Sequence, residues 1–507
     1  MNKKFLRGIV LVAVIIALIA ALSACAPEDN NDTPPDITDK ECEHIWEKVS
    51  ASSGTCVAYG RIDYVCAKCG ATKSESDNTY TQHNYANHVC TVCGARQDGE
   101  QKWTSGDVTV YLYVLSSTVS GDKTYNLLAD GTGKTDDYAV GRQPWAQYCP
   151  QIRRFETVSG VTNVGKNFLY GCDILTEVVL SSEITEIGAG AFGHCPSLDK
   201  FSCGDKIVTV GAGAFSGCVS LRSLSVGLPG STGNGASAQL FGSIFGEGSG
   251  AQTVTIGGTE YSFGVPDSLS YLEIKGDGVI PDYALKSCAS LQTVTISGAV
   301  TEIGNEAFSE MSSLTSFKFT RDTLVRIGDY AFSKNNLLGD AGKSSGDVSS
   351  NAIVLPSTLT ELGEGAFSSC PRLASVVFSG EGLKEIPVLA FGYCSMLVSV
   401  KLPESVEKIG SEAFRNTGLK EVKIGKNVTT VGSRAFDSCT NLATVYVDSE
   451  NVYAGAADSS GLFAQATAVY VLKEIVPDGT AKDPGNSYIK SLTYKGLDRN
   501  GYHLWEK

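Results

Sequence analysis

Residues 400–414 read V-K-L-P-E-S-V-E-K-I-G-S-E-A-F, and a close copy follows after a short gap. The copy, at residues 422–436, reads V-K-I-G-K-N-V-T-T-V-G-S-R-A-F. Both copies end in an alanine–phenylalanine pair and carry apolar residues at matching positions before it. A pattern that returns at this spacing indicates a repeat protein, in which each unit buries its apolar face against the next unit.

The last residue of the pattern recurs through most of the chain as phenylalanine or leucine. We call these residues the landmarks: Leu169, Phe192, Phe215, Leu285, Phe308, Phe332, Phe367, Phe391, Phe414 and Phe436. Most successive landmarks are 22 to 24 residues apart. The sequence therefore predicts a repeat solenoid, because units of this length stack to share one continuous core. We further expect the landmark rings to form one internal stack.

Each unit is expected to begin with a short strand. In residues 291–308, Val294 and Ile296 alternate with threonines, which is typical of a strand with one buried face. After a turn, Val300 and Ile303 again point toward the core. Short parallel strands should therefore cover one face of the solenoid.

The residues around each landmark are expected to form a short helical turn on the opposite face. Gly304 precedes the alanine–phenylalanine pair, but Pro281 and Pro387 stand at the same position in other units. Since proline holds φ near −65°, this position does not need a positive φ. We interpret it as the first position of a helical turn, where proline is tolerated and glycine merely fits.

A cysteine stands three residues after most landmarks. These residues are Cys172, Cys195, Cys218, Cys288, Cys370, Cys394 and Cys439. A ladder of disulfides or metal ligands is one interpretation. However, Met311, Asn335 and Thr417 occupy the same position in other units, so sulfur is not required there. We therefore interpret the cysteines as buried structural thiols.

The pattern L-x-x-V-x-I-P-x-x-V-x-x-I-G-x-x-A-F-x-x-C resembles the BspA-like, or treponemal-type, leucine-rich repeat of bacterial surface proteins. The resemblance covers about residues 145–447. It implies a leucine-rich repeat solenoid at the cell surface. Members of this family are associated with adhesion to host matrix proteins or other cells, so the resemblance also implies a binding role.

The N-terminus has the features of an export signal. Residues 1–24 combine a cationic start, an apolar run at 8–21 and a small-residue ending. The final L-S-A-C, at residues 22–25, resembles a lipoprotein lipobox, which implies cleavage before Cys25 and lipid attachment to its thiol. An ordinary signal peptide with a chance cysteine is the alternative. The polar, proline-bearing residues that follow are expected to be a disordered tether.

Residues 42–101 form a separate cysteine-rich module. V-C-A-K-C-G-A at 65–71 returns as V-C-T-V-C-G-A at 89–95, and this spacing matches a four-cysteine zinc site. The ligands would be Cys66, Cys69, Cys90 and Cys93. Further candidate ligands allow two mixed sites instead: Cys42, His44, Cys56 and His83. The module also looks like small zinc-ribbon-like modules of surface proteins.

Disulfides are the alternative to zinc in this module, because the protein is expected to be exported. Either cross-link would serve a structural purpose. A segment of this size with few large apolar side chains needs such a cross-link to fold.

Six segments are expected: signal peptide 1–24, lipidated cysteine and tether 25–41, cysteine module 42–101, N-terminal cap 102–150, solenoid 151–447 and C-terminal cap 448–507. Two glycine- and serine-rich insertions, at 227–250 and 333–350, interrupt the period. They are either recognition loops or flexible spacers. The second insertion is expected to weaken the coupling between the units on its two sides.

Composition excludes several functions. The net charge is −14, and removal of the cationic leader makes the mature chain more acidic, so nucleic-acid binding is not expected. Only five histidines are present, and His44, His83 and His88 lie in the cysteine module. His194 and His503 are the only others, which leaves the solenoid almost without a general base. We therefore expect no enzyme activity.

Two functions remain. The first is a lipid-anchored surface protein that binds a host matrix protein or another cell through its strand face. The second is a spacer or surface-layer protein without a dedicated ligand. The side chains expected to point off the strands are mixed in charge and include no aromatic stripe: Glu177, Val179, Lys200, Ser202, Tyr271, Glu273, Thr293, Thr295, Lys318, Lys401, Glu421, Lys423 and Tyr446.

Overall fold

The structure is a computed structural model of the chain. It describes residues 45–52, 61–68, 70–76, 85–86, 89–90, 99, 101–117, 121–204, 206, 209–228, 240–339, 352–453, 459–464, 466–476, 489 and 491–507. Contacts divide the chain into two units, residues 1–97 and 98–507.

The described part of the first unit is made of short antiparallel strands. They are β1 (Trp46–Ser52), β2 (Arg61–Cys66), β3 (Thr72–Ser76), β4 (Tyr85–Ala86) and β5 (Val89–Cys90). The first three form one sheet in the order β1-β2-β3, and the last two form a hairpin.

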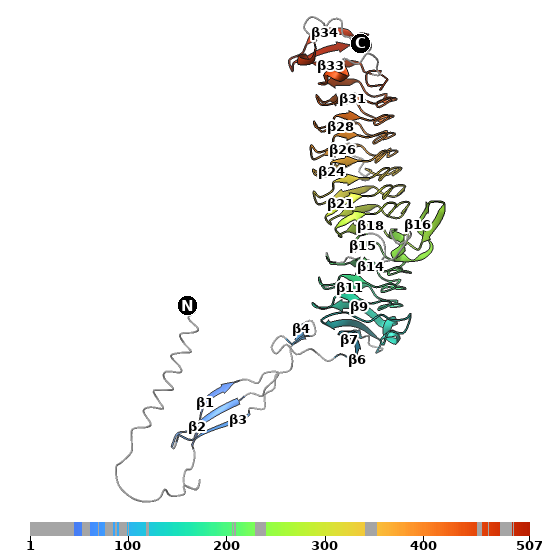
Figure 1. The fold of residues 1–507 in the computed structure, drawn as a ribbon. Coiled ribbons are helices and arrows are strands. Elements are labelled where there is room, and N and C mark those ends of the chain that lie inside the picture. The colour runs from blue at the N-terminus through green and yellow to red at the C-terminus, as the bar shows by residue number, and fades with distance from the viewer. Residues whose placement is uncertain are drawn as a thin grey trace, which may run out of the picture. The chain divides into compact units, whose positions relative to one another are not determined.

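The second unit is a stack of coils with parallel strands on one side, which we call the strand face (Figure 1). Its strands are β9 (Ile152–Thr157), β11 (Glu177–Val179), β13 (Lys200–Ser202), β15 (Ser223–Val226), β18 (Tyr271–Ile274), β20 (Thr293–Ile296), β22 (Ser316–Phe319), β24 (Ala352–Leu355), β26 (Ser375–Phe378), β28 (Ser399–Lys401), β30 (Glu421–Ile424), β32 (Thr444–Val447) and β33 (Ala468–Leu472). The hydrogen-bonded order is broken between β11 and β13, between β22 and β24, and between β28 and β30. The predicted strands on one face are therefore present.

A second row of shorter parallel strands follows the first around each coil. It contains β10 (Asn163–Val164), β12 (Glu186–Ile187), β14 (Thr209–Val210), β19 (Gly278–Ile280), β21 (Val300–Ile303), β23 (Arg326–Ile327), β25 (Glu361–Leu362), β27 (Glu385–Ile386), β29 (Lys408–Ile409) and β31 (Thr430–Val431). The inward apolar residues of both rows form one continuous core.

The segment around each landmark, which we call the turn corner, does not contain the expected helical turn. In the unit of Phe308, Glu306 has φ 51° and Glu310 has φ 60°. The residues two before and two after the landmark have a positive φ in all ten units. A left-handed residue ends a right-handed helix, so the corner is a series of tight turns.

The turn corners bind one coil to the next through their backbones. The N–H groups of Glu306, Phe308 and Glu310 donate to carbonyls of the following coil at 2.8, 2.8 and 2.9 Å. A helical turn would direct these groups to its own carbonyls instead. The left-handed residues therefore let the corner act as a third parallel ladder.

The glycine that precedes most turn corners lies close to the backbone of the preceding coil. Gly304 has no positive φ, as expected. However, a Cβ added to it would lie 2.5 Å from the backbone nitrogen of Asp282 in the preceding coil. Gly328, Gly410 and Gly432 approach the preceding coil in the same way. The interpretation that glycine merely fits at this position is therefore wrong for these units.

The landmark rings stack along the core in two separate runs and not in the single stack expected from the sequence. Successive rings from Phe308 to Phe436 have centroids 5.0 to 5.6 Å apart and planes 2° to 13° apart. Phe192 and Phe215 stack in the same way at 5.7 Å. This is the offset-stacked range for aromatic pairs. The stack is interrupted where leucine replaces phenylalanine and at the first insertion.

The cysteine after the landmark donates to a backbone carbonyl that the ladders leave open. Cys394 Sγ lies 3.1 Å from the carbonyl oxygen of Phe367 in the preceding coil, and Cys218, Cys370 and Cys439 make the equivalent bond. The side chain of Asn335 donates to the Phe308 carbonyl at 2.8 Å. In these five units the position holds a buried donor, and in another unit buried Met311 fills it without one. This agrees with the interpretation as buried structural thiols and with sulfur not being required.

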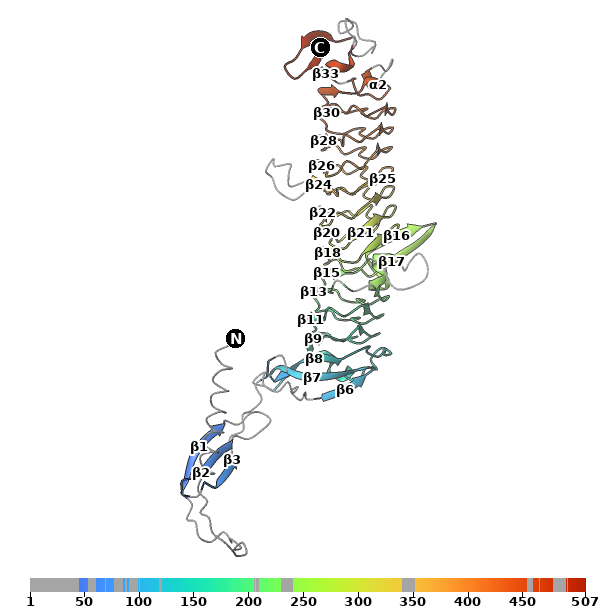
Figure 2. The same cartoon turned by 60° about the vertical axis from the view of Figure 1, so that its left-hand side comes forward.

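Antiparallel strands extend the strand face at both ends (Figures 1 and 2). The N-terminal elements are β6 (Gln101–Ser105), β7 (Val108–Ser117), β8 (Lys123–Gly131) and the 3₁₀ helix η1 (Ala146–Gln151), and those at the other end are α2 (Glu450–Tyr453), η5 (Lys473–Ile475), β34 (Thr493–Leu497) and β35 (Tyr502–Glu506). Trp145 and Trp505 are almost fully buried there. Covering a terminal coil in this way protects its core and its strand edge.

The first insertion supplies a replacement turn corner and a hairpin. The 3₁₀ helix η3 (Phe241–Phe245) lies between the corners of Phe215 and Leu285, and the hairpin of β16 (Glu247–Ile256) and β17 (Thr259–Phe263) projects from the side of the coils (Figure 2). Part of the expected insertion at 227–250 is therefore ordered structure.

Buried Gln252 joins this hairpin to the coils. Its Oε1 accepts from Gly242 N–H at 2.6 Å, and its Nε2 donates to the carbonyls of Lys286 and Ala284 at 3.0 and 3.4 Å. The side chain thus completes the ladder where a regular corner is missing.

Candidate functional site

The strand face opens into a groove between β28 and β30. These neighbouring strands are not paired, and Lys420 N–H reaches the Val398 carbonyl at 3.2 Å beside the opening. The unit that leads into β30 is one residue shorter than its neighbours, since T-G-L at 417–419 stands where C-S-M-L stands at 394–397. This shortening coincides with the interruption of the ladder.

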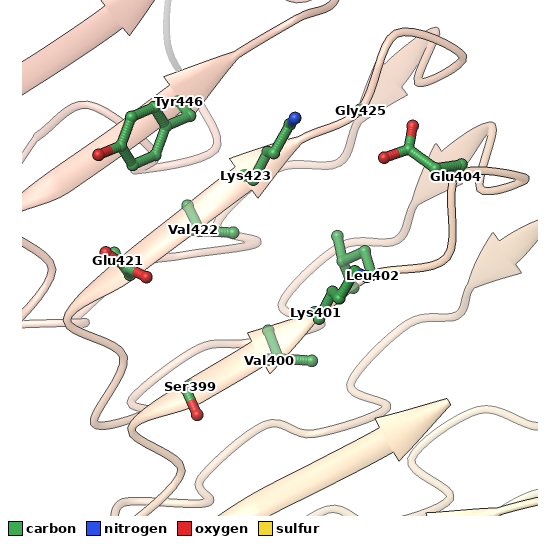
Figure 3. A pocket seen from close by; sticks show the side chains of 10 residues that line it. All are labelled: Ser399, Val400, Lys401, Leu402, Glu404, Glu421, Val422, Lys423, Gly425 and Tyr446. Carbon is green, nitrogen blue, oxygen red and sulfur yellow. The ribbon is translucent and has the colours of Figure 1, made fainter. Parts of the chain in front are cut away.

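The groove encloses about 470 Å³ and has an apolar floor with a charged rim (Figure 3). Its lining consists of Ser399, Val400, Lys401, Leu402, Glu404, Glu421, Val422, Lys423, Gly425 and Tyr446. Val422 and Leu402 are buried, whereas Lys401, Glu404 and Glu421 are exposed. A partner would therefore meet apolar surface with both signs of charge around it.

An ion pair fixes one side of the groove. Lys423 Nζ lies 2.9 Å from Asp448 Oδ2, and the Tyr502 hydroxyl donates to Asp448 Oδ1 at 2.9 Å. The hydrogen bond to Asp448 raises the pKa of Lys423, which stays cationic at neutral pH. Burial, followed by the bond to Asp448, raises the pKa of Tyr502.

Three tyrosines form a cluster beside this ion pair. Tyr446 stacks on Tyr470 with centroids 4.7 Å apart, and Tyr502 meets Tyr446 edge-on at 5.6 Å. All three side chains are half-buried, and burial raises the pKa of Tyr446. The cluster gives the end of the strand face a half-buried aromatic surface.

Sequence reasoning found only part of this site. The side chains expected to point off the strands are all exposed or half-buried, as predicted. Four of them, Lys401, Glu421, Lys423 and Tyr446, meet at the groove, and the others are spread over the coils. The matching segments V-Y-V at 445–447 and 469–471 could have revealed the Tyr446–Tyr470 pair. Tyr502 reaches the cluster because β35 returns antiparallel to β33.

Two of the predicted zinc ligands lie among the described residues. Cys66 is buried at the end of β2, its Sγ accepts from Lys68 N–H at 3.4 Å, and Gly70 follows with φ 75°. Cys90 ends β5. Within the described ranges no three Cys, His, Asp or Glu side chains form a group able to hold a metal.

Most predicted site residues lie outside the described residues. They are Cys25, Cys42, His44, Cys56, Cys69, His83 and Cys93. The zinc site, its disulfide alternative and the lipid anchor therefore stay predictions. In the part of the chain that the structure describes, no helix has the length and apolar character needed to cross a membrane.

Comparisons with solved structures return bacterial repeat proteins of low similarity. A leucine-rich repeat protein from Eubacterium ventriosum ATCC 27560 is 20% identical, with 66% of this chain and 93% of that chain covered and a TM-score of 0.23. A leucine rich cell surface protein from Faecalibacterium prausnitzii A2-165 is 18% identical, with 74% and 95% covered and a TM-score of 0.26. A leucine-rich repeat protein from Bacteroides ovatus ATCC 8483 is 18% identical, with 68% and 94% covered and a TM-score of 0.29. These TM-scores are too low to support any inference about this chain.

The family assignment rests on the repeats themselves. No curated protein matches the chain. The pattern of the BspA type leucine rich repeat region, in six copies, matches residues 146–232, 259–340 and 345–443. These ranges cover more than half of the 507 residues. The chain therefore belongs to the BspA-type leucine-rich repeat family.

Proposed function

We propose that this chain is a bacterial surface protein that binds another protein through the groove between β28 and β30. The observation that carries the proposal is the juxtaposition of an open groove, the Lys423–Asp448 ion pair and the stacked Tyr446 and Tyr470. Protein-binding surfaces combine an apolar centre, a polar rim and aromatic anchors. The groove offers these three features at one place.

A protein partner fits this surface better than a nucleic acid does. The rim carries Lys401 and Lys423 but also Glu404 and Glu421, and the chain as a whole is acidic. Phosphate backbones require a basic surface. The partner would be a host matrix protein or a protein of another cell.

We also propose that the chain binds and does not catalyse. His194 packs against Tyr170 with ring centroids 5.0 Å apart, and His503 Nδ1 is hydrogen-bonded to the Tyr494 hydroxyl at 2.6 Å. Neither histidine lines the groove. A general base is therefore not supplied by histidine at this site.

The proposed anchor is a lipid on Cys25, joined to the solenoid through the tether and a zinc-bound module. Two or more acyl chains hold a protein stably at a membrane. Cys25→Ser should release the protein from the membrane fraction or leave its precursor uncleaved, as seen by fractionation and mass spectrometry. A processed, membrane-bound variant would contradict the anchor and leave the groove proposal untouched.

The groove is tested by binding of the mature chain to matrix proteins and to bacterial and host cells. Tyr446→Ala should weaken binding at least about tenfold, as expected for an aromatic anchor. Tyr271→Ala is the matched control, since Tyr271 is a half-buried strand-face tyrosine outside the groove. Equal loss in both variants, or no loss in either, would place binding elsewhere. The spacer function would follow if no surface retained the parent chain.

A further inference from the structure

One pair of buried cysteines in the N-terminal part of the solenoid differs from the other corner cysteines. Cys149 in η1 and Cys172 in the first turn corner have their Sγ atoms 2.9 Å apart, and both are buried. The next two corner cysteines contact carbonyl oxygens instead of sulfur. Cys195 Sγ lies 3.3 Å from the Leu169 carbonyl oxygen, and Cys218 Sγ lies 3.1 Å from the Phe192 carbonyl oxygen. Among these four cysteines, only Cys149 and Cys172 have their sulfur atoms in contact with each other.

We propose that Cys149 and Cys172 form a disulfide that fastens the N-terminal cap to the first repeat. The two residues hold equivalent positions in adjacent coils. The strands that follow them, β9 and β11, pair Arg154 with Glu177, which is the same offset along the chain. Adjacent parallel strands lie about 4.8 Å apart, within the Cα separation of about 4.4–6.8 Å that a disulfide needs.

The surroundings make Cys149 the first nucleophile. Its Sγ accepts hydrogen bonds from Cys172 Sγ–H and, at 3.5 Å, from Gln143 Nε2. The bond from Cys172 is the main cause that lowers the pKa of Cys149, whereas burial raises the pKa of Cys172 well above its ordinary value. The thiolate is the form that attacks a disulfide, so the sulfur with stabilising donors reacts first and the sulfur that burial keeps protonated reacts second.

The bond forms by two exchanges with a disulfide oxidant, which is a disulfide-carrying oxidoreductase in the cell or oxidised glutathione in a test. The Cys149 thiolate attacks one sulfur of the oxidant, and the other sulfur leaves as a thiolate. Cys172 then loses its proton and attacks the Cys149 sulfur, and the second oxidant sulfur leaves. The two cysteines lose two protons and two electrons, and the oxidant becomes two thiols.

Such a bond would act on the weakest part of a repeat array. A terminal coil has a neighbour on one side only, so it opens more readily than an inner coil. The bond would tie η1, which follows buried Trp145, to the corner of Leu169. Opening of the cap would then require loss of a covalent link as well as of packing.

The test is peptide mapping of the full mature chain equilibrated with oxidised and reduced glutathione. Free thiols are alkylated under denaturing conditions, and the chain is then cut with trypsin and a glutamate-specific protease. The second protease is needed because cleavage after Glu177 separates Cys172 from Cys195. We expect a Cys149–Cys172 linked peptide that lacks two hydrogens, with Cys195 and Cys218 alkylated. Complete alkylation of Cys149 and Cys172 in the oxidised sample would overturn the proposal. So would a link from Cys172 to Cys195.

A stability measurement supplies a second readout. The melting temperature of the oxidised parent chain should fall when reductant is added. Cys149→Ser should remove this sensitivity, whereas the control Cys218→Ser, from the same row, should keep it. Equal sensitivity to reductant in Cys149→Ser and in the parent would show that another bond is responsible.

Discussion

The rings of Phe332 and Phe367 are stacked with centroids 5.0 Å apart and planes 2° apart, although the second insertion separates them in the sequence. Tyr330 and Phe332 also donate to the corner of the next unit at 2.7 Å. The insertion breaks only the strand face, where β22 and β24 are not paired. The turn-corner contacts therefore continue across the insertion while the strand pairing is interrupted, and weaker coupling between the units stays a prediction.

Removal of one ring from this stack should destabilise several units. The ring centroid of Phe391 lies 5.6 Å from that of Phe367 and 5.5 Å from that of Phe414. Phe391→Ala therefore removes packing in three coils. The free energy of unfolding should fall by roughly 3–5 kcal/mol. Hydrogen exchange should show the largest loss of protection between residues 367 and 436. Exposed Val377→Ala is the control, and a uniform loss over all coils would mean one cooperative unit.

The corner cysteine should be replaceable by a donor but not by an apolar isostere. Cys394→Thr keeps a hydroxyl that can donate to a landmark carbonyl, as the Thr417 hydroxyl donates to the carbonyl of Phe414 in its own coil at 2.9 Å. Cys394→Val has the same shape but leaves the Phe367 carbonyl without a donor, which costs about 1–3 kcal/mol. Urea unfolding of the two variants measures this difference. Equal stability of the two variants would show that the thiol contributes only packing.

Alkaline pH should unfold the solenoid through its buried thiols. Burial raises the pKa of Cys218, Cys288 and Cys394 from 9.0 to about 12. Below pH 9 the thiols are protonated in both states, and above it only the unfolded chain ionises. Each thiol then lowers the free energy of unfolding by about 1.4 kcal/mol per pH unit until its folded pKa is reached.

The difference between parent and Cys394→Thr isolates this effect. The variant lacks one such thiol, so its stability should fall less steeply above pH 9 in urea unfolding. Val377→Ala, which keeps every thiol, should follow the slope of the parent. Parallel slopes for the parent and Cys394→Thr would show that Cys394 ionises equally in both states.

Loss of Gln252 should release the inserted hairpin without unfolding the coils. Gln252→Leu leaves the Lys286 carbonyl and Gly242 N–H without their partner, at a cost of about 1–3 kcal/mol for each. Hydrogen exchange should rise in residues 240–263 and stay unchanged near Phe414. Thr255→Ala, on an exposed position of β16, is the control. Unchanged exchange in Gln252→Leu would mean that apolar contacts alone hold the hairpin.

Zinc removal should affect the cysteine module alone. We expect about one or two zinc ions per mature chain, because small sites of this kind couple folding to metal binding. A chelator should then loosen β2 around buried Cys66, seen as faster hydrogen exchange, while the landmark core keeps its protection. Metal-free protein with intact disulfides in residues 42–93 would favour the alternative.

The sequence by itself determined the solenoid. The period of the landmarks, the alternation at Val294 and Ile296 and the residue choice at the corner all follow from burial, and burial leaves a direct trace in residue type. The stacking of Phe391 on its neighbours could be predicted for the same reason. Each of these features depends on a side chain and its place in the repeat.

The tertiary structure alone decided the backbone of the corner and the position of the candidate site. The left-handed φ of Glu306 is only weakly marked in residue type, since glycine or asparagine stands at that position in four units but glutamate, tyrosine, leucine or arginine in the other six. The need for Gly304 arises from the distance between coils. The groove lies where β28 and β30 are not paired, and Tyr502 joins Tyr446 because β35 folds back. These features depend on distances between separate coils, and a repeat pattern reports only the order of residues within a coil.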